Sequence, residues 1–228
     1  MSGLRMLRFG AALTTLLSAA ALSTGSAVAA PPDSAAKGKG KPGEFDYYIL
    51  SLVWNPEECA RQGKKADPVR CVGDRRAGFL ARGLWPEYEN GRRPEDCAKV
   101  DAVPPEMLEA IRPIMTDDAA TQQLWRRHGS CAGLSVDFYF ADMRVAFERI
   151  KLPEMFKNPI GTFSLPAIEA VNRIADANPE LPPASIAGVC EKKKLTEVRI
   201  CVTKDLEPRT CSPNVTANCS DKDSLLAP

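Results

Sequence analysis

The sequence predicts an α+β protein in which an antiparallel β-sheet core is packed with several α-helices. An aromatic and β-branched run from Phe45 to Trp54 is typical of a central strand. Segments with apolar residues at helical spacing occupy the middle of the chain, and the alternating run from Thr196 to Thr203 predicts a late strand. Strands on either side of a helical region are typical of α+β proteins with helices on one side of the sheet.

Residues 1–29 have the pattern of a signal peptide. Arg5 and Arg8 form a basic region, Phe9 to Leu22 is a core of apolar and small residues, and Ala27-Val28-Ala29 matches a cleavage site. We therefore expect a secreted or periplasmic protein, cut after Ala29. An uncleaved membrane anchor is the alternative, but the apolar run is shorter than a spanning helix, and no later stretch is apolar enough to cross a bilayer.

Residues 30–44 predict a disordered linker, because Pro31 to Gly43 is rich in Pro, Gly and Lys and lacks large apolar side chains. Residues 45–228 then form a single domain with room for a core. The whole sequence has 30 basic residues (Lys and Arg) and 29 acidic residues (Asp and Glu). Removal of Arg5 and Arg8 with the signal peptide leaves 28 basic and 29 acidic residues, which gives a net charge of −1. This balance excludes a globally basic nucleic-acid-binding protein, although local basic runs such as Arg92-Arg93 and Arg126-Arg127 remain.

The mature chain holds an even number of cysteines, which in an exported protein predicts four disulfides. A zinc site is the alternative, but no C-x-x-C occurs and the chain has one histidine. Spacing alone leaves about 105 pairings open. The eight residues are Cys59, Cys71, Cys97, Cys131, Cys190, Cys201, Cys211 and Cys219.

The first half of the domain predicts two strands joined by a loop. After Trp54, the residues from Pro56 through Glu57-Glu58 are expected to begin a loop that contains a charged turn at Gly63-Lys64-Lys65. The apolar run Gly78 to Ala81 leads into Arg82-Gly83-Leu84-Trp85-Pro86. Because Pro86 should stop regular structure, this motif is expected at a strand end, before a loop from Glu87 to Pro94.

The helical region predicts four helices. Pro104-Pro105 open the first, Asp117-Asp118 cap the second, which ends at Gly129, Ser135 starts the third, and Pro166 opens the fourth, Ala167 to Asn178. The first helix has Met107, Leu108, Ile111, Ile114 and Met115 at helical spacing. The residues expected on the buried face of the third helix are Phe138, Tyr139, Met143, Phe147 and Ile150.

Two motifs carry the chemistry: Arg82-Gly83-Leu84-Trp85-Pro86 and Trp125-Arg126-Arg127-His128-Gly129-Ser130-Cys131. The second motif holds the single histidine of the chain. Proton transfer near neutral pH by an unshifted side chain must therefore use His128. Phe79 to Pro86 is similar to the first active-site segment of the ribonuclease T2 family, where a histidine precedes Gly-Leu-Trp-Pro. Leu124 to Cys131 is similar to its second segment, Glu-Trp-x-Lys-His-Gly-Thr-Cys. Further landmarks at Ile49 to Trp54 and Leu195 to Cys201 also resemble this family.

The resemblance implies an α+β fold and a secreted endoribonuclease that acts without a metal or other cofactor. Its substrate would be single-stranded RNA, or nucleotides would be its ligands, and the 2′-hydroxyl would attack the phosphate to leave a 2′,3′-cyclic end. A monomer without membrane contact is expected. The disulfides implied by the resemblance are Cys59–Cys71, Cys97–Cys131, Cys201–Cys211 and Cys190–Cys219.

Carried over position by position, His128 is the expected base, and Arg127 stands where the family has a lysine. Arg82 replaces the histidine expected to act as acid, and Leu124 replaces the glutamate. A guanidinium cannot usefully donate a proton at neutral pH, but it can hold a phosphate. The candidate catalytic residues are thus His128, Arg127 and Arg82, and the candidate substrate-binding residues are Trp85, Gln123 and Arg126.

We therefore expect a protein that binds RNA but cleaves it weakly or not at all, a pseudoenzyme, because losing one acid–base partner costs about 10²–10⁴-fold in rate. Alternatives are a slow endoribonuclease, and a non-catalytic RNA-binding or envelope interaction protein on the same scaffold. Trp85 and Trp125 are more often core aromatics than base-stacking rings. Arg82 could instead pair with an acid such as Glu87, and Glu87 or Glu89 could supply the missing acid.

Overall fold

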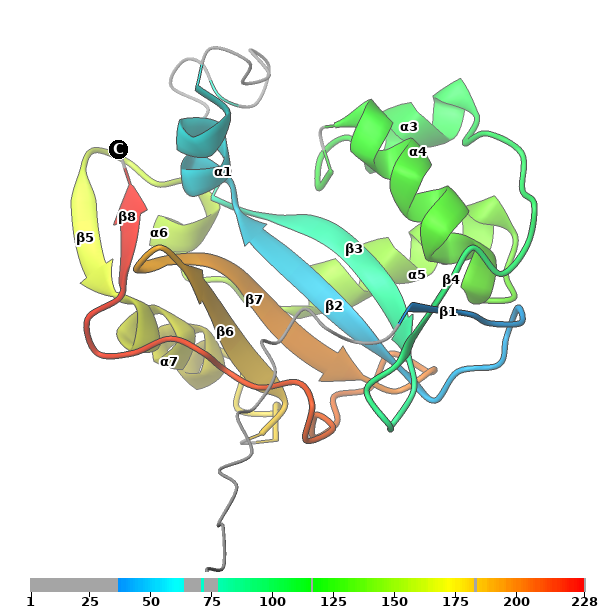
Figure 1. Ribbon diagram of the computed structural model, residues 1–228. Helices are drawn as coiled ribbons and strands as arrows, with labels where there is room; N and C mark the ends of the chain where they lie inside the picture. The colour runs from blue at the N-terminus through cyan, green and yellow to red at the C-terminus, as the bar shows by residue number, and fades with distance from the viewer. Residues whose placement is uncertain (1–36, 64–70, 72–77, 116, 183, 228) are drawn as a thin grey trace, which may run out of the picture. The chain divides into compact units, whose positions relative to one another are not determined.

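The computed structural model describes residues 37–63, 71, 78–115, 117–182 and 184–227. In this part of the chain a six-stranded sheet has the order β3-β2-β7-β8-β5, with β6 paired to β7 (Figure 1). Within these described ranges, six α-helices and one 3₁₀-helix accompany the sheet. The predicted α+β class is therefore confirmed. In the described residues, no helix combines the length and apolar character needed to span a bilayer.

The centre of the sheet is strand β2 (Tyr47–Trp54), which pairs antiparallel with β3 (Phe79–Glu87) and β7 (Lys194–Val202). Nearly every residue of β2 is buried, as its continuous aromatic and β-branched sequence predicted. Ser51 lies opposite Gly83 on one side and Arg199 on the other. This register places the first motif, on β3, and the late predicted strand, β7, on either side of one central strand.

The expected loop after Trp54 is instead a helix, α1 (Asn55–Gln62). Pro56 stands in the first turn, where the N–H that proline lacks would have no partner within the helix. Glu57 and Glu58 stabilise the helix because their negative charges lie near the positive end of its dipole. The loop prediction overlooked these start signals. The predicted turn at Gly63-Lys64-Lys65 lies largely outside the described residues.

Strand β3 runs through the whole first motif, so the prediction that Pro86 ends regular structure is wrong. Pro86 pairs with Tyr48 and the strand continues to Glu87. Because β3 is an edge strand, an absent N–H on its outer side removes no ladder hydrogen bond.

The segment expected to be a disordered linker contributes strand β1 (Lys37–Lys39), parallel to β4 (Arg93–Glu95). Such pairing uses backbone groups and needs no apolar side chain. The predicted signal peptide, 1–29, lies outside the described residues.

The predicted helix starts are confirmed. Asp117 caps α4 by accepting a hydrogen bond from the Ala120 N–H at 2.9 Å, and Ser135 caps α5. The core face of α5 differs from the expectation, since Phe138 is 68% exposed and Phe140 is buried. That face centres on Tyr139 and Met143, four residues apart, and Phe138 falls outside it. The helices are α3 (Pro105–Ile111), α4 (Asp118–Arg127), η2 (Gly129–Cys131), α5 (Val136–Arg149), α6 (Glu154–Lys157) and α7 (Ala167–Ala177), and the remaining strands are β5 (Phe163–Pro166), β6 (Ile186–Glu191) and β8 (Ser224–Ala227).

All eight cysteines lie in the described residues and form four disulfides with the pairing that the resemblance implied. The Cys97–Cys131 bond joins the segment after β4 to η2, immediately after α4. It therefore ties the chain that follows the first motif to the end of the second.

Candidate active site

Strand β3 presents the first motif with Arg82 half-exposed and its neighbours buried. At Gly83 a side chain has no room, because a Cβ would lie 2.6 Å from Leu124 Cδ1 and would also collide with the Trp85 ring. Tyr139 of α5 donates a hydrogen bond of 2.7 Å to the Leu84 carbonyl. Helix α5 therefore fixes the motif through Tyr139, and the Trp85 ring packs over Gly83.

The second motif is placed by the end of α4. His128 follows the last helical residue and is 9% exposed. Its ring lies 5.8 Å from that of Trp85, centroid to centroid. Trp125 donates a hydrogen bond of 3.0 Å to the Asp101 carbonyl, and Ser130 donates one of 2.7 Å to the Arg126 carbonyl. The two motifs therefore meet where Trp85 packs against His128.

Residues of both motifs line one open cavity of about 440 Å³. Five of the six predicted site residues are among them: Arg82, Trp85, Gln123, Arg127 and His128. Arg126, although expected to bind substrate, is exposed and is not among the residues that line the cavity. Leu124, which replaces the family's glutamate, also lines the cavity. The remaining lining residues, which sequence analysis did not single out for the site, are Arg93, Glu95, Ala120, Val189, Glu191, Glu197 and Arg199.

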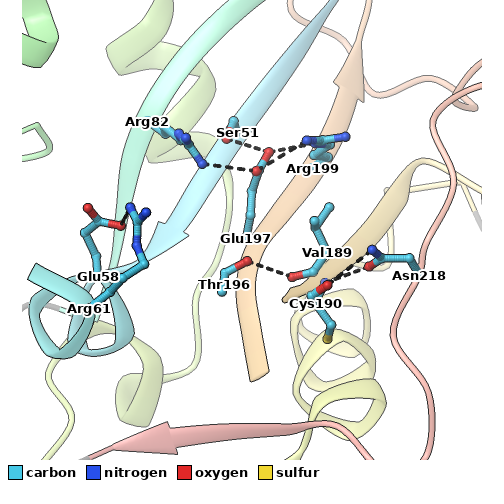
Figure 2. A network of polar contacts seen from close by, with 10 residues as sticks. All are labelled: Ser51, Glu58, Arg61, Arg82, Val189, Cys190, Thr196, Glu197, Arg199 and Asn218. Atoms are coloured by element: carbon cyan, nitrogen blue, oxygen red, sulfur yellow. Dashed lines mark hydrogen bonds and ion pairs between the residues drawn. The ribbon is translucent and has the colours of Figure 1, made fainter. Parts of the chain in front are cut away.

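The arginines of the cavity are ion-paired with carboxylates. Arg82 Nη1 lies 3.4 Å from Glu197 Oε2, and Arg199 Nε lies 2.7 Å from Glu197 Oε1 (Figure 2). Ser51 donates a further hydrogen bond of 2.9 Å to Glu197. The partner of Arg82 is thus Glu197 and not Glu87, which corrects that expectation.

The other two arginines have partners on β3 and β4. Arg127 Nη2 lies 2.9 Å from Glu95 Oε2, and Arg93 pairs with Glu87. A phosphate that enters this cavity must therefore compete with carboxylates already in contact with the cations.

The rings of Trp85 and Trp125 are core aromatics, 7% and 5% exposed. Trp85 nevertheless reaches the cavity, where the guanidinium of Arg93 lies 4.4 Å and that of Arg199 6.0 Å from its ring. Trp85 therefore organises the cations of the cavity more than it offers a free face for a base.

Neither glutamate suggested as a replacement acid lies in the cavity. Glu87 is 1% exposed, and burial raises its pKa to about 7, against the opposing effect of Arg93. The pKa of Glu89 is lowered by hydrogen bonds from Arg209 and Ser212. The carboxylates that do line the cavity are Glu95, Glu191 and Glu197. One signal for them was visible in the sequence, since Glu197 and Arg199 are charged residues two positions apart and therefore share one face of a strand.

Fold and cavity together define a disulfide-bonded α+β protein with one imidazole and several arginines in an open cleft. Within the described residues, no group of three or more His, Cys, Asp or Glu could hold a metal ion. The chain belongs to the Ribonuclease T2 family, which it matches over residues 45–211. This membership supports a ribonuclease-like function.

Individual relatives agree with this assignment. A protein named "Ribonuclease" from Aeromonas hydrophila is 31% identical over 216 residues, covering 85% of this chain and 90% of the relative. The solved structure of trichomaglin, described as an S-like ribonuclease, has a TM-score of 0.61 at 21% identity and covers 81% of this chain and 100% of its own. RNase NT, solved in complex with 5′-AMP, has a TM-score of 0.52 at 16% identity and covers 78% of this chain and 100% of its own.

Proposed function

We propose that this protein binds single-stranded RNA or nucleotides in the cavity and that its cleavage of RNA is greatly weakened or lost. The observation that carries the proposal is the contact between Arg82 and Glu197 at the first-motif position. A guanidinium in an ion pair stands where cleavage needs a group that gains and loses a proton near neutral pH.

Binding is supported by the charges of the cavity. Arg82 is half-exposed and Arg127 about a third exposed, so both can turn toward a phosphate. Guanidinium groups bind phosphate oxygens through two parallel hydrogen bonds. The complex of RNase NT with 5′-AMP supports a nucleotide as ligand of this fold.

Two substitutions relative to the family motifs, at residues 82 and 124, support weak turnover. Arg82 cannot protonate a departing 5′-oxygen, and such a group typically contributes about 10²–10⁴-fold to the rate. The side chain of Leu124 is 4% exposed and apolar, so it offers no charge to the phosphorane. His128 remains as the one imidazole.

A secreted or periplasmic location completes the proposal, and its support is chemical. Four disulfides persist in oxidising compartments and are rare in the cytosol. Residues 1–29, with their signal-peptide pattern, would be removed on export. We further propose that the exported protein is a monomer.

The test compares binding with cleavage in the same protein. Purified protein is incubated with RNA in the presence of a chelator, and the products are examined for 2′,3′-cyclic ends, with His128→Ala as a control for contaminating nuclease. Binding is measured separately with 2′-O-methyl RNA, which lacks the attacking hydroxyl. We expect salt-sensitive binding and little cleavage. Robust cleavage that disappears in His128→Ala would overturn the impairment, and absence of binding would favour a scaffold that serves protein contacts.

A further inference from the structure

The carboxylate of Glu197 is held unequally at its two oxygens. Oε1 accepts hydrogen bonds of 2.9 Å from Ser51 Oγ and 2.7 Å from Arg199 Nε. Oε2 contacts Arg82 Nη1 and Arg199 Nη2, each at 3.4 Å (Figure 2). One oxygen is therefore anchored by short bonds, whereas the other faces Arg82 through long ones. Glu197 also lines the cavity.

The contact between Arg82 and Oε2 is the one that a ligand can replace. The Arg82 side chain is 52% exposed, whereas that of Arg199 is 7% exposed. The contact from the half-exposed Arg82 is long, at 3.4 Å, whereas a guanidinium binds a phosphate through two charge-assisted hydrogen bonds. A phosphodiester in the cavity would therefore draw Arg82 to itself and leave Oε2 open toward the ribose, with Arg199 still in place.

We infer that Glu197 is the general base for the RNA transfer that remains, and that His128 is its general acid. The inference rests on the proposed function, and it reverses the role that the resemblance implies for His128. Ser51, Arg82 and Arg199 each donate a hydrogen bond to the Glu197 side chain, as donors do to a carboxylate that accepts protons. The imidazolium of His128 is then the group that can donate one.

The step balances with these two groups. The ribose 2′-oxygen attacks phosphorus and its proton passes to Glu197 Oε2, while Arg82 and Arg127 hold the non-bridging oxygens. The bond from phosphorus to the 5′-oxygen breaks, and that oxygen takes the proton of His128. The products are a 2′,3′-cyclic phosphate and a free 5′-hydroxyl, after which both side chains exchange protons with water.

The placement of the two groups suits an in-line displacement. Glu197 lies on β7 and His128 at the end of α4, and both line the same cavity. The Trp85 ring also lines this cavity, and it lies 5.8 Å from the His128 ring and 6.0 Å from the guanidinium of Arg199, which binds Glu197. Base and acid thus come from different elements that line one cavity, and an in-line displacement needs two separate groups for attack and departure.

The test uses the full mature protein and two kinds of substrate. The first is the set of 4-nitrophenyl esters of the four ribonucleoside 3′-phosphates, whose leaving group departs without an acid. The second is a set of dinucleotides, whose leaving group needs one. We expect Glu197→Gln to lower turnover of both by about 10²-fold or more, and His128→Ala to lower only that of the dinucleotides. In the wild type, aryl-ester turnover should stay constant between about pH 5 and pH 8, the range in which an imidazole ordinarily changes charge.

A matched control comes from a second carboxylate that pairs with β7, Glu57 of α1. Glu57 Oε2 lies 2.9 Å from Nζ of Lys194 on β7, outside the cavity, so Glu57→Gln should leave both turnovers unchanged. Thermal unfolding and binding of 2′-O-methyl RNA show whether Glu197→Gln is folded, and Glu197→Asp, which keeps a carboxylate, should recover part of the lost rate.

Three results would overturn the inference. In the first, His128→Ala abolishes turnover of the aryl esters while a folded Glu197→Gln retains it. This result would show that His128 is the base. The second is wild-type turnover of the aryl esters that follows the imidazole titration. The third is wild-type protein that binds 2′-O-methyl RNA but does not cleave the aryl esters faster than buffer does. Wild-type protein that fails to bind 2′-O-methyl RNA would overturn the proposed function instead.

Discussion

Arg127 Nη2 lies 2.9 Å from Glu95 Oε2, so the cation that the second motif retains is already an ion pair in the free protein. Glu95 is 8% exposed and comes from β4, which follows the first motif in the chain. The pair therefore joins the two halves of the cavity. A phosphate binds Arg127 only if that interaction is more favourable than the Arg127–Glu95 ion pair.

Arg127→Ala should weaken RNA binding and make it less sensitive to salt. Removing one phosphate contact lowers the slope of log affinity against log salt by about one. Arg126→Ala is the matched control, because this neighbouring arginine is exposed and does not line the cavity. Fluorescence anisotropy with 2′-O-methyl RNA at several salt concentrations measures both. Equal effects of the two substitutions would contradict the placement of Arg127 at the phosphate.

Arg82→His should raise RNA cleavage by about 10²–10⁴-fold, because it restores a group that gains and loses a proton near neutral pH. Glu197 would keep its bonds to Ser51 and Arg199 in this variant, so the fold should tolerate it. The measurement is the initial rate of 2′,3′-cyclic product, with wild-type protein prepared in the same way as the reference. If Arg82→His binds RNA but gains no activity, the loss at Leu124 and not the one at residue 82 limits the rate.

The free energy of unfolding should fall as the pH rises and Glu87 loses its proton. Burial raises the pKa of this carboxyl from about 4.5 to about 7, so the folded state binds its proton more tightly than the unfolded chain does. Its contribution is therefore fully present below about pH 4.5 and is lost as the pH rises through about 7. The loss amounts to about 3 kcal/mol, since a tenfold change in proton affinity corresponds to about 1.4 kcal/mol.

Glu87→Gln should remove this dependence, so the variant should gain stability relative to wild type between about pH 4.5 and pH 8. Urea unfolding at several pH values measures the difference. Glu89→Gln is the control of opposite sign, because the pKa of Glu89 is lowered and its contribution is lost as the pH falls. A difference between wild type and Glu87→Gln that does not change with pH would refute a raised pKa.

Removal of the Cys97–Cys131 bond should impair RNA binding more than removal of Cys190–Cys219. The bonds close loops of similar length, with sequence separations of 34 and 29, so each should contribute about 3–4 kcal/mol to stability. Only Cys97–Cys131 ties the segment after Glu95 to the segment after His128. Paired Cys→Ala variants, compared by urea unfolding and by RNA affinity, separate the two effects. Equal losses of affinity would show that the bond braces the fold alone.

Much of the fold followed from local sequence signals. Asp117 and Ser135 cap helices as expected, because an N-cap acts within its own first turn. The helix at Asn55–Gln62 was missed although its start signals were present, and the burial of Phe138 was assigned wrongly. The course of β3 through Pro86 could not be predicted, because a proline is tolerated only when its strand lies at the edge of the sheet.

The sequence by itself determined which groups are available for chemistry: one histidine, an arginine at residue 82 and a leucine at residue 124, in motifs of the ribonuclease T2 family. Only the tertiary structure decided what Arg82 and Arg127 contact, since Glu197 and Glu95 are far from them in the chain. Ion pairs between distant segments depend on strand order and register, which no local pattern encodes. For that reason the cations were foreseen, whereas the carboxylates that hold them were not.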